Sequence, residues 1–211
     1  MSSRFSDRSW VAEDRLVIKS AALAILAIFI VPGAAHGATP ASAAPCAPRA
    51  FTTIFSALGD RALYTLAPDG GFETGGAGWT RSARTTVVGE SSTIKLGPAR
   101  GTKSLQLAPG ASATSPAICV ERGFSGFRFV ARSARAAQGV VNVEVLHATG
   151  KTMLRGAIRT TAAWRATKSV KLVEGQFKVR VGQSTTVRLK FTASGGPVRI
   201  DDVYVDPRLR G

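Results

Sequence analysis

The fold is decided by one stretch near the C-terminus, Pro197-Val198-Arg199-Ile200-Asp201-Asp202-Val203-Tyr204-Val205-Asp206, in which two adjacent carboxylates interrupt a run of β-branched and aromatic residues. This composition predicts a β-strand. A strand places successive side chains on opposite faces, so one of Asp201 and Asp202 is predicted to point toward the core. A buried carboxylate needs an ion pair, hydrogen bonds or a metal. The chain must therefore supply a partner from elsewhere.

A second acidic stretch lies far upstream, at Asp69-Gly70-Gly71-Phe72-Glu73, and Gly78-Trp79 follows it. A Gly-Phe-Glu turn with a tryptophan shortly after it and a closing Ile-Asp-Asp-Val strand resemble the two ends of the galactose-binding-like jelly roll. This β-sandwich is the fold of many carbohydrate-binding modules. The resemblance rests on about a dozen residues and brackets a domain over residues 61–206. It implies the fold and leaves the ligand open.

Hydrophobic residues alternate with polar ones along most of residues 61–206. The alternation is clearest in 127–132, 141–145 and 187–191, and it is the pattern of strands with one buried face. Further strands are expected at 85–88, 103–107, 117–120, 153–158, 164–173 and 177–181. Gly- and Pro-rich breaks separate these strands. The sequence therefore predicts an all-β fold, an antiparallel jelly-roll β-sandwich.

Residues 51–59 fit two patterns. Phe51, Ile54, Phe55 and Leu58 have helical spacing, whereas Phe-Thr-Thr-Ile-Phe is also a good strand composition. We expect an extended segment that runs into 61–66.

The N-terminus is typical of a secretion signal. Basic residues precede an apolar run over 21–31 and then small residues, and the run is shorter than the ~20 residues that span a bilayer. We predict a signal peptide over 1–37, an Ala/Pro-rich lead-in over 38–60 and a basic tail over 207–211. The predicted localisation is secreted or associated with the cell envelope. The alternative is an uncleaved signal that anchors the chain to a membrane.

The chain has two cysteines, Cys46 and Cys119, and both lie after the predicted signal. In an oxidising compartment such a pair most simply forms one disulfide. This bond would tie the lead-in to the sandwich. Free thiols or metal ligands are the alternative, but His147 is the only histidine after residue 37, which leaves no cluster for a zinc site.

The resemblance also implies a structural calcium ion, which in such modules is held by the Glu of the Gly-Phe-Glu turn and an Asp of the closing strand. In this sequence these residues are Glu73 and one of Asp201 and Asp202, while Asp69 stands where the family often has Asn. Calcium accepts six to eight oxygen ligands in irregular geometry. The alternative is that the aspartate pairs with an arginine such as Arg61 or accepts backbone N–H groups. The sequence leaves both open.

Enzyme activity is not expected. His147 lies at a predicted turn, and the ten acidic residues after residue 37 show no spacing that marks a general acid and its partner. Trp79 and Trp164 are expected in the core, which leaves few aromatic rings for stacking on neutral sugars. A small secreted hydrolase is the less favoured alternative.

Basic residues outnumber acidic ones by 28 to 13, and the net charge is +15. Several cations fall on the polar side of the predicted strands, and they form one cationic face if those strands are neighbours: Arg128, Arg132, Lys178, Arg180, Arg188 and Lys190. The predicted function is a non-catalytic module that binds an anionic glycan or cell-wall polymer through this face. A structural cell-surface protein without a specific ligand is the alternative. No motif indicates specific nucleic-acid binding.

Overall fold

The computed structural model describes residues 46–97, 101–121, 123–124, 126–135, 138–171, 179 and 182–206, with only the backbone of Leu154 and Lys171. The predicted signal peptide (1–37), the start of the lead-in, the basic tail (207–211), Lys178 and Arg180 lie outside these residues. In the part of the chain that is described, no helix is long and apolar enough to cross a membrane.

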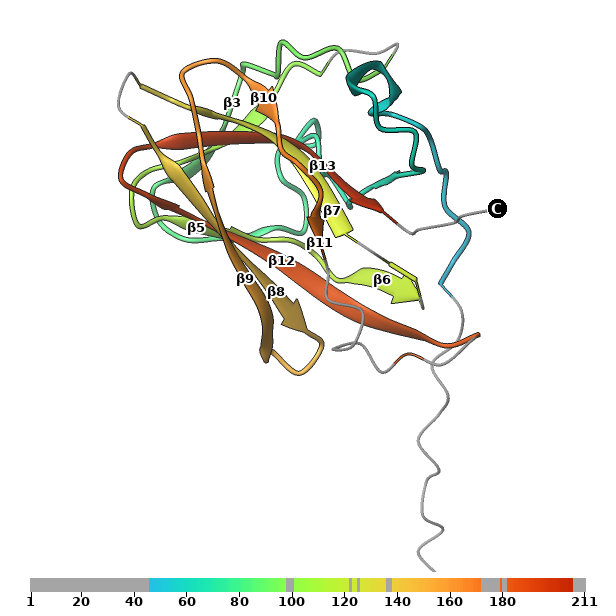
Figure 1. Cartoon of the computed structure of the whole chain (residues 1–211). Coiled ribbons are helices and arrows are strands. Elements are labelled where there is room, and N and C mark those ends of the chain that lie inside the picture. The colour runs from blue at the N-terminus through green and yellow to red at the C-terminus, as the bar shows by residue number, and fades with distance from the viewer. Residues whose placement is uncertain are drawn as a thin grey trace, which may run out of the picture. The chain divides into compact units, whose positions relative to one another are not determined.

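The strands of the described residues lie in two antiparallel sheets (Figure 1). The first, which we call the β13 sheet, has the order β10 (Arg165–Ala166), β7 (Gly126–Ser133), β13 (Val198–Asp206), β4 (Ser104–Leu107), β3 (Thr85–Val88), with β1 (Thr65–Leu66) paired to β13 and β11 (Val170–Lys171) paired to β7. The second, the β12 sheet, has the order β2 (Thr80–Arg81), β5 (Ser112–Thr114), β12 (Ser184–Ser194), β8 (Val140–His147), β9 (Thr152–Arg159), with β6 (Ile118–Glu121) paired to β12.

The chain passes repeatedly from one sheet to the other, and three of these passages are β4 to β5, β7 to β8 and β12 to β13. The β12–β13 run lies in the middle, because β13 pairs with β7 and β4 while β12 pairs with β8 and β5. This wrapping of antiparallel runs across two sheets is the jelly-roll arrangement. The predicted all-β antiparallel jelly-roll sandwich is confirmed.

The main core lies between the two sheets and follows the predicted alternation. Phe127 and Phe129 of β7 and Leu189 and Phe191 of β12 are all buried in it. Trp79 belongs to the same core, as expected, and its ring lies 5.0 Å from that of Phe72. The alternation therefore identified the inward side of β7 and of β12.

The Asp201-Asp202 pair differs from its prediction, because neither aspartate points into the main core. A register shift between Asp201 and Tyr204 places Ile200 and Val203 on the inward side, three residues apart. Asp202 takes a left-handed conformation, with φ of 51°. Such a bulge inserts one extra residue and restores the alternation beyond it. Val203 is held there by backbone hydrogen bonds with Ala67 and Gly70.

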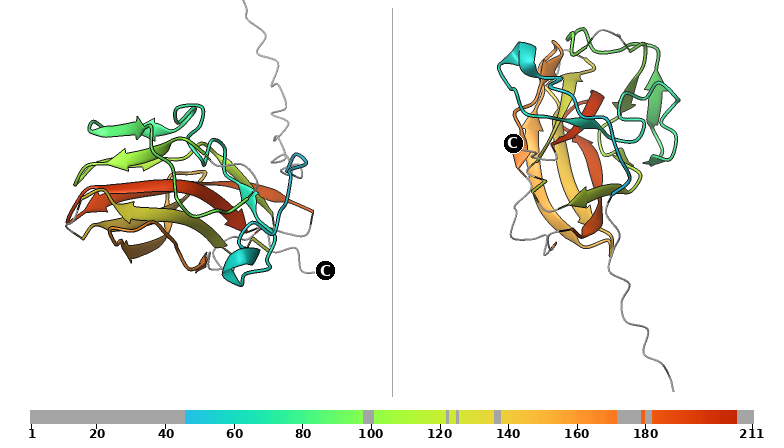
Figure 2. Two further views of the ribbon diagram at one scale, coloured as in Figure 1. Left: turned by 90° about the horizontal axis from the view of Figure 1, so that it is seen from above. Right: turned by 90° about the vertical axis from the view of Figure 1, so that its right-hand side faces the viewer.

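The lead-in is packed against the outer face of the β13 sheet. A 3₁₀ turn, η1 (Ser56–Leu58), and one isolated bridge replace the extended segment expected over 51–59. Phe55 is fully buried in a second apolar cluster with Tyr64, Val130 and Trp164. Figure 2 shows this segment, in blue and cyan, running outside the strands. Trp164 is thus buried as expected, but in this second cluster.

Cys46 and Cys119 form the predicted disulfide. Beside it, the Cys46 backbone N–H donates to Glu121 Oε1 at 2.8 Å, and Arg49 Nη1 donates to the Cys119 carbonyl at 2.7 Å. These contacts connect residues 46–49 of the lead-in to β6.

Candidate functional site

The basic residues singled out in the sequence do not form one face. Arg128 and Arg132 lie on β7 of the β13 sheet, whereas Arg188 and Lys190 lie on β12 of the other sheet. Each pair points away from the core between the sheets, and the two pairs therefore face opposite sides of the sandwich. The expectation of a single cationic face is wrong, because alternation shows which side of a strand is polar but not which sheet the strand joins.

Arg128 is unsuited to ligand binding. Its side chain is buried, with 8% exposure of the residue, and Nη1 donates to Asp60 Oδ2 at 2.7 Å. The guanidinium also lies over the Phe55 ring, at 4.2 Å from its centroid. Burial opposes ionisation of Asp60, but hydrogen bonds from Tyr64, Ala62 and Arg128 outweigh it, and the pKa of that carboxyl is lowered. Arg128 therefore holds the lead-in on the sheet.

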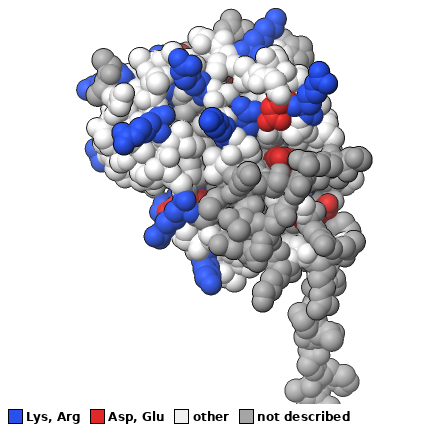
Figure 3. Space-filling model, in the orientation of Figure 1, with Lys and Arg blue, Asp and Glu red and all other residues white. Residues whose placement is uncertain are grey.

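Three exposed arginines and one half-buried lysine lie on the outer face of the β12 sheet, which we call the β12 face, while other exposed cations, such as Arg61 and Lys168, lie elsewhere. Across β5, β12, β8 and β9 its charged side chains are Arg155, Arg159, Arg188, Lys190 and Glu144. Lys190 stands opposite Glu144, which stands opposite Arg155. Along these four strands the face thus carries four cations and one carboxylate, and Glu121 of β6 adds a second carboxylate on the same side of the sheet. Figure 3 shows, in the orientation of Figure 1, Lys and Arg spread over the visible surface with few Asp or Glu.

Glu144 neutralises part of this charge. Its carboxylate lies 3.0 Å from Lys190 Nζ and 3.1 Å from Arg155 Nε. The hydrogen bond from Lys190 lowers the pKa of Glu144; burial opposes this, but with the added effect of Arg155 the pKa stays below its usual value. Arg159 and Arg188 are exposed and have no acidic partner among the residues described. They are the cations that remain available to a ligand.

Short polar side chains lie beside these cations. Thr192 is flanked by Ser112 on β5 and by Asn142 on β8, and Asn142 Nδ2 donates to Ser194 Oγ at 2.8 Å. Within the described strands β5, β12, β8 and β9, no aromatic ring faces outward. Such a surface binds through charge and hydroxyl hydrogen bonds, and it lacks a platform for stacking on a sugar ring.

Asp201 is satisfied without a metal. Its Oδ2 accepts from Ser92 N at 2.8 Å and Ser91 Oγ at 3.0 Å, and its Oδ1 accepts from the Asp202 N–H at 2.8 Å. Burial and the charge of Asp202 nevertheless raise the pKa of Asp201 to about 7. The sequence left open whether this aspartate binds calcium or accepts hydrogen bonds from the protein. Asp201 accepts hydrogen bonds from backbone N–H groups and a hydroxyl.

Asp202 differs from its neighbour, because no hydrogen bond to its carboxylate is found among the described residues. It lines a polar cavity of about 170 Å³ together with Ser91, Gly101 and Tyr204. Burial and the nearby charge of Glu73 raise the pKa of Asp202 to about 6. Two neighbouring carboxylates repel each other when both are ionised. A metal ion bound between them would stabilise the ionised form of both.

Glu73 is oriented by the loop before β4. Its Oε1 accepts from the N–H groups of Thr102 and Lys103, at 2.8 and 2.9 Å, and its Oε2 accepts from Thr102 Oγ1 at 2.8 Å. Asp69 caps its own turn by accepting from Thr74, Gly76 and Ala77. Within the described ranges no group of three His, Cys, Asp or Glu side chains is placed to hold a metal. Of the predicted calcium ligands, Asp202 alone has a carboxylate without a hydrogen bond among the described residues, whereas both oxygens of Glu73 accept from Thr102 or Lys103.

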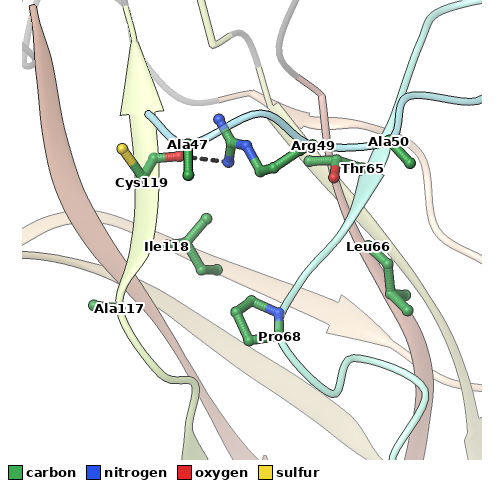
Figure 4. Close-up of a pocket in the computed structure, with 9 residues that line it drawn as sticks. All are labelled: Ala47, Arg49, Ala50, Thr65, Leu66, Pro68, Ala117, Ile118 and Cys119. Carbon is green, nitrogen blue, oxygen red and sulfur yellow. Dashed lines mark hydrogen bonds between the residues drawn. The ribbon is translucent and has the colours of Figure 1, made fainter. Parts of the chain in front are cut away.

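A larger pocket, of about 470 Å³, lies between the lead-in, β1 and β6 (Figure 4). Its lining is mostly apolar, with Leu66, Pro68 and Ile118 on its walls. Arg49 is the charged residue in it, and Figure 4 shows its guanidinium turned to the Cys119 carbonyl. Arg49 also lies over the Phe124 ring, at 5.2 Å. Apart from Arg49 and Thr65, the pocket is lined by Ala, Leu, Pro, Ile and Cys residues, so few polar groups converge in it.

His147 gives no sign of catalysis. Its ring contacts Thr149 in the turn after β8 and Thr185 Oγ1, at 3.4 Å, and no carboxylate among the described residues. It is the last residue of β8, and its carbonyl accepts from the Gly150 N–H of the turn that follows.

Sequence reasoning missed Arg155, Arg159 and Glu144 as members of the β12 face. The signal was present, since Arg155, Ala157 and Arg159 alternate with Gly156 and Ile158, and a strand was predicted over 153–158. What was missing was the pairing of that strand with β8.

No protein-family model matches the chain, and no curated protein does. Solved structures that resemble it include TmCBM61 in complex with beta-1,4-galactotriose (18% identity, 66% of this chain, 96% of that chain, TM-score 0.41). The CBM22-1 xylan-binding domain of Paenibacillus barcinonensis Xyn10C is also similar (15% identity, 64% of this chain, 90% of that chain, TM-score 0.43). A structure described as Family 16 Carbohydrate Binding Module-2 is similar as well (17% identity, 66% of this chain, 97% of that chain, TM-score 0.43). TM-scores below 0.5 do not establish a shared fold, so the assignment here rests on strand order and pairing, and no ligand is carried over.

Proposed function

We propose that this chain is a secreted, non-catalytic module that binds acidic polysaccharides of the cell envelope or its surroundings through the β12 face. The observation that carries the proposal is the charge of that face, on which exposed Arg159 and Arg188 lack acidic partners among the described residues and Glu144 balances only part of the rest. Export is supported by the leader-like N-terminus and by the disulfide.

The spacing of the cations suits a flexible polyanion. Alternate residues of one strand lie about 6 to 7 Å apart on the same side, and neighbouring strands are separated by about 4.8 Å. Charges at such intervals contact successive acidic groups along a chain. Binding of this kind weakens with salt, because the Debye length is about 8 Å near physiological ionic strength.

A calcium ion is part of the proposal, as a structural cofactor remote from the β12 face. Glu73 and Asp202 would hold it together with backbone oxygens. Bound there, it would offset the mutual repulsion of these two carboxylates.

The experiment compares retention of the secreted protein on immobilised polygalacturonate and on neutral xylan, at low and high salt. We expect retention on polygalacturonate that is lost as salt rises, and little retention on xylan. Equal behaviour on both polymers, or retention indifferent to salt, would favour a structural surface protein without a specific ligand.

A further inference from the structure

Two arginines face each other on the outer face of the β13 sheet, on the opposite side of the sandwich from the β12 face. Arg132 of β7 and Arg199 of β13 are register partners, and their neighbours Ala131 and Ile200 point into the core. Like charges placed directly opposite each other destabilise a sheet. This pair therefore requires an anion.

Glu90, in the segment after β3, supplies that anion in the free protein. Its Oε1 lies 2.8 Å from Arg132 Nη2, and its Oε2 contacts Arg199 Nη1. Arg199 Nε donates to Gln106 Oε1 at 2.9 Å. The Glu90 side chain is 43% exposed, more than either arginine. One accessible carboxylate thus serves two guanidinium groups.

Donors remain unused around this pair. Arg132 Nε and Trp164 Nε1 are buried and have no hydrogen-bond partner in the described part of the chain. The Arg132 guanidinium lies over the Trp164 ring, at 5.6 Å from its centroid. Each guanidinium has five N–H donors in a planar fork that matches a carboxylate. The cluster therefore has more donors than Glu90 and Gln106 can satisfy.

We propose that Arg132, Arg199 and Trp164 form a second anion-binding site, which takes a carboxylate of an acidic polysaccharide in place of Glu90. Glu90 lies outside any strand and its side chain is 43% exposed, so the carboxylate can turn away from the arginine pair while the Glu90 carbonyl keeps its hydrogen bond from Ser104 Oγ. Together with the β12 face, on whose proposed function this step rests, the site would let one domain bridge two polymer chains.

The test isolates the site from the β12 face. All variants carry Arg159→Glu and Arg188→Glu, and the probe is trigalacturonate, titrated calorimetrically and followed by tryptophan fluorescence. Glu90→Gln removes the internal competitor and keeps its size. We expect it to bind trigalacturonate about ten-fold more tightly than its parent, which retains Glu90, the factor that corresponds to one charge-assisted hydrogen bond. Adding Arg199→Gln should abolish the gain.

If the Arg199→Gln variant does not fold, the fluorescence of the Glu90→Gln protein still tests the site. Ligand bound beside Arg132 must change the fluorescence of Trp164 in that protein. A sulfated disaccharide as a second probe distinguishes carboxylate from sulfate recognition. Equal affinity of the Glu90→Gln protein and its parent, with unchanged fluorescence, would overturn the site.

Bridging is measured by light scattering with long polygalacturonate. Protein with both faces intact should increase scattering, and Arg132→Gln with Arg199→Gln should lower it while column retention through the β12 face persists. Column retention of the Arg159→Glu, Arg188→Glu protein tests the proposed function of the β12 face. Trigalacturonate titration of the same protein with Glu90→Gln added tests only the second anion-binding site. Scattering that is unchanged by the Arg132 and Arg199 substitutions would overturn the bridging role.

Discussion

Arg128 Nη1 donates to Asp60 Oδ2 at 2.7 Å, and this contact joins the lead-in to the centre of the β13 sheet. Asp60 also accepts from Tyr64 OH at 2.7 Å. A residue that the alternation marked as a surface cation is thus part of a buried network under Phe55.

We predict that Arg128→Met lowers the free energy of unfolding by about 2 kcal/mol, because it leaves Asp60 without its cation and Asp60 is only partly exposed. Urea unfolding measures the change. Retention on polygalacturonate should not change, since Arg128 lies behind the lead-in. A variant that keeps full stability but loses retention would restore Arg128 to the binding surface.

Local sequence patterns predicted most of the strands and which side of each strand is buried. Val141, Val143 and Val145 face inward and Asn142 and Glu144 outward, as period-two alternation requires, because burial of one face is decided strand by strand. The disulfide followed from there being only two cysteines.

Long-range relationships were not predictable in the same way. The bulge at Asp202 depends on backbone contacts of Val203 with Ala67 and Gly70, more than 130 residues upstream. Sheet membership depends on pairing, so the sequence could not show that Arg132 and Arg188 face opposite sides. For the same reason the sequence did not indicate that Glu90 forms ion pairs with Arg132 and Arg199.

The buried acids predict a pH dependence. The pKa of Asp201 is raised from 3.8 to about 7 in the folded state by burial and the charge of Asp202. The folded protein therefore binds this proton more tightly than the unfolded chain, and the stability it contributes is full below about pH 4 and is lost as pH rises through about 7.

We predict that Asp201→Asn gains stability relative to wild type, on the order of 2 kcal/mol, when calcium-free protein is moved from pH 5 to pH 7.5. Comparing the two proteins cancels the opposite contributions of Asp60, Asp69 and Glu144, whose pKa values are lowered. Parallel melting curves for both proteins at both pH values would contradict the raised pKa.

Calcium should stabilise the native state at pH 7.5. At 100 times its dissociation constant the gain is about 2.7 kcal/mol by mass action, and chelator should reverse it. Asp202→Asn should remove the effect, and Asp201→Asn should keep it as the control, because Asp201 is already satisfied by three donors. A calcium shift that survives Asp202→Asn would exclude this site.

The disulfide should matter for stability. It closes a loop with a sequence separation of 73, worth roughly 4 kcal/mol in the chain-entropy model. Replacing Cys46 and Cys119 together with serine should lower the melting temperature and expose the segment near Ala50 to protease. Peptide mapping gives the cleavage sites, and both thiols found free in exported wild-type protein would argue against the bond.

The central claim is that the β12 face binds acidic polymer through its unpaired arginines, and salt-gradient elution from immobilised polygalacturonate tests it most directly. Three proteins are compared: wild type, Arg159→Glu with Arg188→Glu, and the charge-matched control Arg61→Glu with Lys168→Glu, whose exposed side chains lie outside the face. We predict that the first double variant elutes at much lower salt than wild type and that the control elutes close to wild type. Elution of all three at the same salt, or equal losses in both variants, would contradict the account.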